Sequence, residues 1–99
     1  MLAKQVYEKK VAKKLYLFKW QIEALQIFEE NAAKAYQWNI CNKIEFLKHK
    51  QQALEDKFHA FRETDGTVWQ EMKKGIDALQ KDMLCSISKA HTEIIEVTY

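Results

Sequence analysis

The sequence predicts an all-α protein, because apolar residues recur at intervals of three and four along nearly its whole length. Two further features agree with that class: the chain contains no proline, and its only two glycines, Gly66 and Gly75, lie in the last third. Proline and glycine are the residues that most strongly interrupt a helix. Nothing before Gly66 therefore forces a helix to end.

The first apolar stripe predicts one long helix over about residues 4–63. Its members span about 15 helical turns, and they are Tyr7, Val11, Leu15, Phe18, Ile22, Leu25, Ala32, Tyr36, Ile40, Ile44, Leu47, Leu54, Phe58 and Phe61. A break near Asn31, which would give a three-helix monomer, is the competing interpretation. The segment 29–33 contains no strong helix breaker, so we expect the helix to continue.

A tight turn is predicted at residues 64–67. Gly66, which follows Asp65, can take the left-handed conformation that ends a helix. Thr67 suits the N-cap of the next helix, and Gln70 stands three residues later as its capping-box partner. One helix therefore stops and another starts within a few residues, which predicts antiparallel neighbours.

A second apolar stripe predicts a return helix over about residues 68–96, so the chain should form a coiled-coil-like helical hairpin. Gly75 lies inside this helix at a cost of about 1 kcal/mol, and we expect a close approach of the long helix to compensate. The expected hairpin core consists of Ile44, Leu47, Leu54, Phe58, Phe61, Trp69, Met72, Ile76, Leu79 and Met83.

The return helix is too short to cover the long one. At ~1.5 Å per residue it reaches back only to about residue 35, so the single domain, 1–99, divides into an arm at 5–34 and a hairpin at 35–97. We expect the arm to be covered by a second chain, in an antiparallel homodimer with a three-helix bundle at each end. The predicted oligomer interface is Leu15, Phe18, Trp20, Ile22, Leu25 and Phe28.

The arm also has a second apolar face, roughly opposite its main stripe. Apolar residues on two sides of a helix indicate packing against more than one neighbour. This second face consists of Val6, Leu17, Trp20, Ala24, Ile27 and Phe28.

The charge of the chain is small overall but unevenly placed. The net charge is +2, yet residues 1–20 contain six lysines and a single acidic residue. An amphipathic basic segment of this kind is typical of helices that lie on an anionic membrane surface, which is the alternative function. Contact with nucleic-acid phosphates is a weaker alternative. Because the lysines are scattered around the helix, we favour self-assembly over both.

No residue pattern predicts catalysis, a cofactor or a metal. Glu55, His59 and Glu63 share one helix face, but ordinary solvated pairing explains that spacing. Cys41 and Cys85 fit neither a disulfide framework nor a metal site, so we expect two inert thiols and no enzyme activity. No apolar run approaches the ~20 residues of a membrane span, and no secretory signal is visible, so we expect a cytoplasmic protein.

Several segments follow one another in a recognisable order. They are Tyr7 and Leu15, then Trp20-Gln21-Ile22-Glu23-Ala24-Leu25, then Ala32-Ala33-Lys34-Ala35-Tyr36, then Ile44, Leu47 and Lys50, and finally Asp65-Gly66-Thr67-Val68-Trp69-Gln70-Glu71-Met72-Lys73-Lys74-Gly75-Ile76. In this order they resemble a family of short bacterial coiled-coil proteins described as stress-response proteins of the cyanobacterial type. The similarity spans about residues 5–92. It implies a helical hairpin, a stress-related role and no known enzymatic activity.

Overall fold

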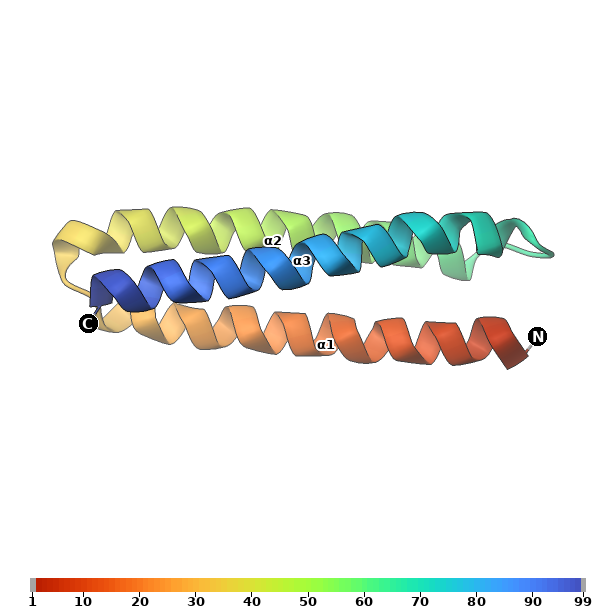
Figure 1. Ribbon diagram of the computed structural model, residues 1–99, viewed down its shortest axis with the longest axis horizontal. Helices are drawn as coiled ribbons and strands as arrows, with labels where there is room; N and C mark the ends of the chain where they lie inside the picture. Colours follow the sequence, from red (N-terminus) through yellow and green to blue (C-terminus); the bar gives the residue numbers. More distant parts are fainter. Residues whose placement is uncertain (1, 99) are drawn as a thin grey trace.

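Residues 2–98 fold as three helices, each antiparallel to the next along the chain, packed into one elongated bundle (Figure 1). The computed structural model describes residues 2–98, and the side chains of residues 3–96; the ends of the predicted domain, 1 and 99, lie outside that range. The helices are α1 (Leu2–Asn31), α2 (Lys34–Arg62) and α3 (Val68–Thr98), and the bundle measures 52 × 17 × 17 Å. The predicted all-α class is confirmed for the described residues.

The single long helix predicted over residues 4–63 is wrong, because the chain reverses direction between α1 and α2. The chain forms three helices, as in the competing interpretation with a break near Asn31. α1 has 30 residues and α2 has 29, so each can cover the other along its whole length. Tertiary packing of this kind, more than intrinsic propensity, decides where a helix ends.

Polar side chains stabilise both sides of the break. The Asn31 Nδ2 donates to the carbonyl oxygen of Ile27 at 2.8 Å, which caps the end of α1. The Gln37 Nε2 donates to the carbonyl oxygen of Ala32 at 3.1 Å. Ala32 and Ala33 lie between the two helices, and Ala33 is extended, with φ −60° and ψ 146°.

All three helices contribute to one hydrophobic core. Its buried members are Val11, Leu15, Phe18, Ile22 and Leu25 from α1, Ile40, Ile44, Leu47, Leu54, Phe58 and Phe61 from α2, and Ile76, Met83, Ile87, Ala90 and Ile94 from α3. Trp69, Met72 and Leu79 are partly buried against it. Every residue predicted for the hairpin core therefore lies in or against this interior.

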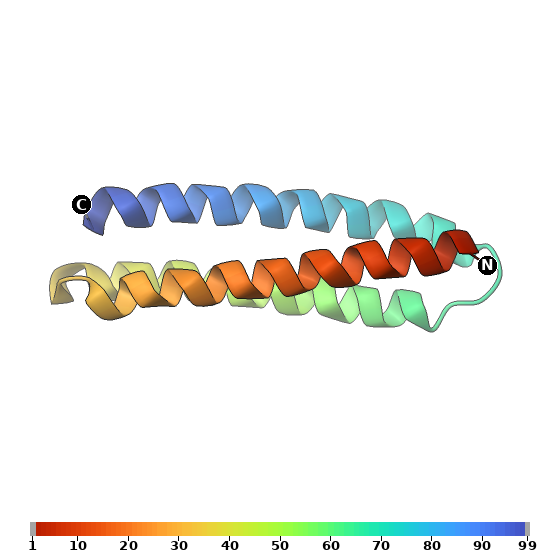
Figure 2. The ribbon, with the colours of Figure 1, turned by 90° about the horizontal axis from the view of Figure 1, so that it is seen from below.

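Four residues predicted for the oligomer interface are also inside this core: Leu15, Phe18, Ile22 and Leu25. The prediction assumed that residues 5–34 have no cover from their own chain, and that assumption is wrong. Figure 2 shows α1 lying along both other helices, which contact it. The four side chains are consequently not available to a second chain in this fold. Of the remaining two, Phe28 is half-buried and Trp20 is exposed.

The turn between α2 and α3 forms around Gly66, which has φ of 67° and is thus left-handed. Asp65 and Thr67 flank it and are exposed. The Thr67 carbonyl oxygen accepts the backbone N–H of Gln70 at 3.1 Å, in the first turn of α3.

Lys4 ties the start of α1 to this turn. Its Nζ donates to the carbonyl oxygens of Arg62 and Thr64, just where α2 ends. A cation at a helix C-terminus is stabilised by the unpaired carbonyls there. Lys4 therefore links the start of α1 to the end of α2 and to the turn that leads into α3.

Gly75 does not serve a close helix approach, contrary to expectation. It is exposed on α3, and a Cβ atom added there would meet no atom within 4 Å.

Candidate interaction surface

The outer side of α1 carries large apolar side chains that the bundle leaves exposed. We define the α1 outer face as Val6, Leu17, Trp20, Ala24 and Ile27, which lie on one side of the helix by their spacing of threes, fours and elevens. Val6, Leu17, Trp20 and Ile27 are 50%, 46%, 63% and 60% exposed. These are the residues of the second apolar face seen in the sequence, and only Phe28 of that set turns inward.

A shallow apolar groove between α1 and α3 continues this face. Trp20, Ala24 and Phe28 line it from α1, and Leu84 and His91 line it from α3, around a volume of about 450 Å³. The rings of Phe28 and His91 meet edge to face, with centroids 6.2 Å apart. Leu84 is itself 56% exposed, so the apolar surface extends from α1 onto α3.

Charge divides α1 into two parts. Residues 1–20 hold six lysines and one glutamate, a net charge of +5, whereas residues 21–31 hold three glutamates and no lysine or arginine. Lys9, Lys10, Lys13, Lys14 and Lys19 are exposed and make no ion pair with any described residue. The outer face therefore lies on a helix that is basic at one end and acidic at the other.

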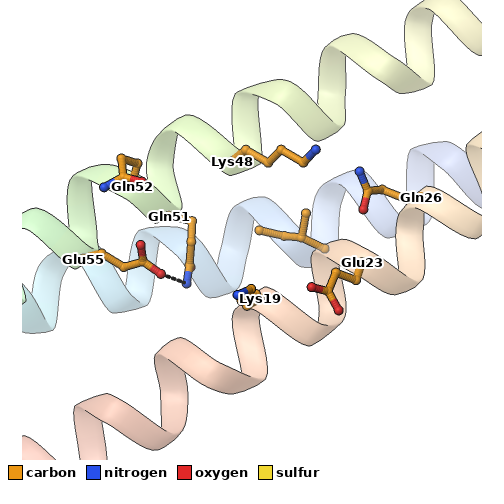
Figure 3. Close-up of a pocket in the computed structure, with 8 residues that line it drawn as sticks. Lys19, Glu23, Gln26, Lys48, Gln51, Gln52 and Glu55 are labelled. Carbon is orange, nitrogen blue, oxygen red and sulfur yellow. Dashed lines mark hydrogen bonds between the residues drawn. The ribbon is translucent and has the colours of Figure 1, made fainter.

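The groove between α1 and α2 is different in kind, because polar side chains line it (Figure 3). Lys19 and Glu23 come from α1, and Lys48 and Glu55 from α2. At its base Gln51 donates from Nε2 to the Leu15 carbonyl oxygen at 3.0 Å and to Glu55 Oε1 at 3.2 Å. Side chains of both charges line this groove, so it is not an apolar binding surface. The hydrogen bond from Gln51 to the Leu15 carbonyl oxygen joins the two helices here.

The other candidates from the sequence do not assemble into a site. Among the described residues no group of three histidine, cysteine or acidic side chains is placed to hold a metal ion. His59 and Glu63 form an exposed i, i+4 pair at 3.8 Å, while Glu55 bonds to Gln51 on the inner side.

The two cysteines are free thiols, Cys41 half-buried and Cys85 exposed. A hydrogen bond to Glu29, together with desolvation, raises the pKa of the Cys41 thiol. The neutral thiol is thereby favoured, which is the opposite of what a nucleophilic cysteine requires.

Comparison with protein families, with curated proteins and with solved structures finds no match to this chain. Its resemblance to the bacterial coiled-coil family therefore stays a prediction. Between residues 2 and 98 no helix is both long enough and apolar enough to cross a membrane.

Proposed function

We propose that this protein is a non-enzymatic helical assembly module that self-associates through the α1 outer face. The observation that carries the proposal is the exposure of Leu17, Trp20 and Ile27 along one side of a single helix. Removing a side chain of this size from water contributes about 1.5–3 kcal/mol. Contiguous apolar surface of this kind is typical of protein interaction sites.

The proposed interface differs from the one predicted from helix lengths. It keeps Trp20 and the edge of Phe28, and it replaces the four core residues with Leu17, Ala24 and Ile27. In this proposal all three helices of each bundle come from one chain, and the dimer forms when two such bundles associate. A cytoplasmic, bacterial and stress-related setting belongs to the same proposal, and it rests on the family resemblance alone.

Substitution of Trp20 tests this function. Trp20→Glu places a charge in the centre of the proposed interface, so we expect the dimer dissociation constant to rise at least tenfold in sedimentation velocity runs. Trp38→Glu is the matched control, because Trp38 is 77% exposed on α2, away from the α1 outer face. Equal effects of the two substitutions, or no effect of Trp20→Glu, would contradict the proposal.

Binding to an anionic membrane surface is the second candidate. The five exposed, unpaired lysines of α1 favour it, since each lysine near such a surface contributes about 1 kcal/mol. Co-sedimentation with vesicles of phosphatidylserine and phosphatidylcholine, compared with phosphatidylcholine alone, tests it. Binding to the anionic vesicles only, lost in Lys9→Gln/Lys13→Gln, supports this candidate; equal binding to both or to neither contradicts it.

A further inference from the structure

We infer that the part of the α1 outer face from Leu17 to Ile27 is covered by the same part of a second copy, laid antiparallel so that the two Trp20 side chains meet near the two-fold axis. This inference rests on the proposed self-association and adds the orientation and register of the pair. An interface that pairs one patch with itself is the arrangement that closed dimers use.

Charge selects the antiparallel orientation. Parallel α1 helices would place the lysine-rich residues 1–20 of one chain beside the same residues of the other. Antiparallel helices centred on Trp20 place residues 9–19, which hold five lysines and no acidic residue, beside the partner's residues 21–31, which hold only acidic charges. Like charges across an interface are costly and opposite charges are favourable. The helix dipoles also oppose one another in the antiparallel pair, which is their favourable arrangement.

Spacing along α1 then sets the register. Lys9 lies 11 residues before Trp20, and Glu30 lies 10 residues after it. Centring the pair on Trp20 therefore brings Lys9 beside Glu30 of the second copy, twice by symmetry. Both side chains are exposed in the single chain and free to meet.

Apolar contacts fit the same register. Leu17 and Ala24 lie three residues before and four after Trp20, so each faces the other across the pair. Lys13 and Ile27 lie seven residues either side, and the aliphatic stem of Lys13 can cover Ile27 while its ammonium group stays in water. The paired residues 9–31 extend over about 35 Å of the 52 Å length of the bundle.

Cysteine cross-linking tests the register directly. In a Cys41→Ser/Cys85→Ser background, Lys13→Cys and Ile27→Cys are made as separate chains. A disulfide requires two Cα atoms within about 7 Å. In the antiparallel pair two copies of position 13 are about 21 Å apart. We therefore expect disulfide-linked dimers on a non-reducing gel only when the two chains are mixed.

The outcomes separate this inference from the proposed function. Cross-linking of each chain with itself would show a parallel pair and would overturn the inference, while a dimer mass in solution would leave self-association standing. A dimer mass without any cross-link would also overturn it, because the chains would then meet elsewhere. A monomer mass at every concentration would overturn both.

Charge reversal gives an independent test of the same register. Lys9→Glu and Glu30→Lys should each raise the dimer dissociation constant about tenfold in low salt, since each removes two symmetry-related pairs. The double variant, with the charges exchanged, should return to within about threefold of the starting value. Additive losses in the double variant would overturn the register.

Discussion

Gln51 places a polar amide inside the apolar core between α1 and α2. Its Nε2 reaches the Leu15 carbonyl oxygen on α1, but its Oε1 has no hydrogen-bond partner among the described residues. Burying an unpaired amide oxygen costs stability. A polar residue in such a position can fix the register of two helices. Gln51 lies four residues after Leu47, toward one edge of the apolar stripe, but only the structure shows which carbonyl oxygen it contacts.

Replacing Gln51 by leucine should raise the free energy of unfolding by about 1 kcal/mol, because the unpaired oxygen disappears and the Leu15 carbonyl keeps its helical partner. Chemical denaturation with circular dichroism measures this. Gln52→Leu, at an exposed neighbour, is the control and should change little. A loss of stability in Gln51→Leu would mean that its bond to α1 outweighs the unpaired atom.

The two glycines should respond to alanine with opposite signs. Gly66→Ala forces a side chain into the left-handed region and should lower the free energy of unfolding by about 1–2 kcal/mol. Gly75→Ala meets no atom within 4 Å and should raise it by about 1 kcal/mol through helix propensity. Urea unfolding of both variants measures these changes, and changes of the same sign would contradict the assignment of Gly66 to a left-handed position that alanine tolerates poorly.

At the scale of the elements, the sequence predicted helical secondary structure and the turn at Gly66, but it did not predict the end of α1 at Asn31. Glycine and a capping pattern mark the turn at residues 64–67, whereas Ala32 and Ala33 are good helix formers. The apolar spacing also runs on across the break, because both helices face the same core. Asn31 was the one local signal, and its side chain does cap the end of α1.

The start of α2 lacks a capping side chain, so it can be improved. Ala33 occupies the N-cap position without a side-chain hydrogen bond. Ala33→Ser should raise the free energy of unfolding by about 1 kcal/mol, since serine would accept a backbone N–H of the first turn. Ala12→Ser, at an exposed position inside α1, should lower it slightly. If thermal melts rank these two variants the other way, the break is not at Ala33.

Ion pairs join α2 to α3 and make the bundle sensitive to acid. Lys43 bonds to Glu93, and Lys50 Nζ lies 2.6 Å from Asp82 Oδ2. The hydrogen bond from Lys43 holds the pKa of Glu93 below its ordinary value. A carboxyl with a lowered pKa contributes stability above its unfolded pKa and loses it as the pH falls through the folded value. Glu93 therefore stabilises the fold at neutral pH and ceases to do so in acid.

Glu93→Gln should accordingly lower the melting temperature at pH 7, and the difference from the parent protein should disappear in acid, once the pH has fallen through the lowered pKa of Glu93. Melting curves of the two proteins across this range measure the effect. Glu45→Gln is the control, because the one ion-pair partner of Glu45 among the described side chains is Lys48 on its own helix, at 3.6 Å. A difference between Glu93→Gln and the parent protein that stays constant with pH would contradict the assignment.

For the whole molecule, the sequence predicted two apolar faces on residues 5–34, but it did not predict which of them the chain covers itself. Two apolar faces on residues 5–34 were visible as a pattern, and the structure buries one and exposes the other. Helix-length arithmetic left residues 5–34 without cover from their own chain, because the break that lets α2 and α3 cover α1 carries almost no sequence signal. The sequence alone shows how charge is distributed along α1. The structure is needed to show which side of the helix is exposed, and therefore which charges could lie beside a second chain.

The solution mass of the protein, measured by light scattering from low micromolar to millimolar concentration, tests the central claim most directly. Self-association through the α1 outer face predicts a mass of twice the 11.8 kDa chain, which falls to that of one chain on dilution or on Trp20→Glu substitution. A mass of 11.8 kDa at every concentration would contradict self-association through the α1 outer face.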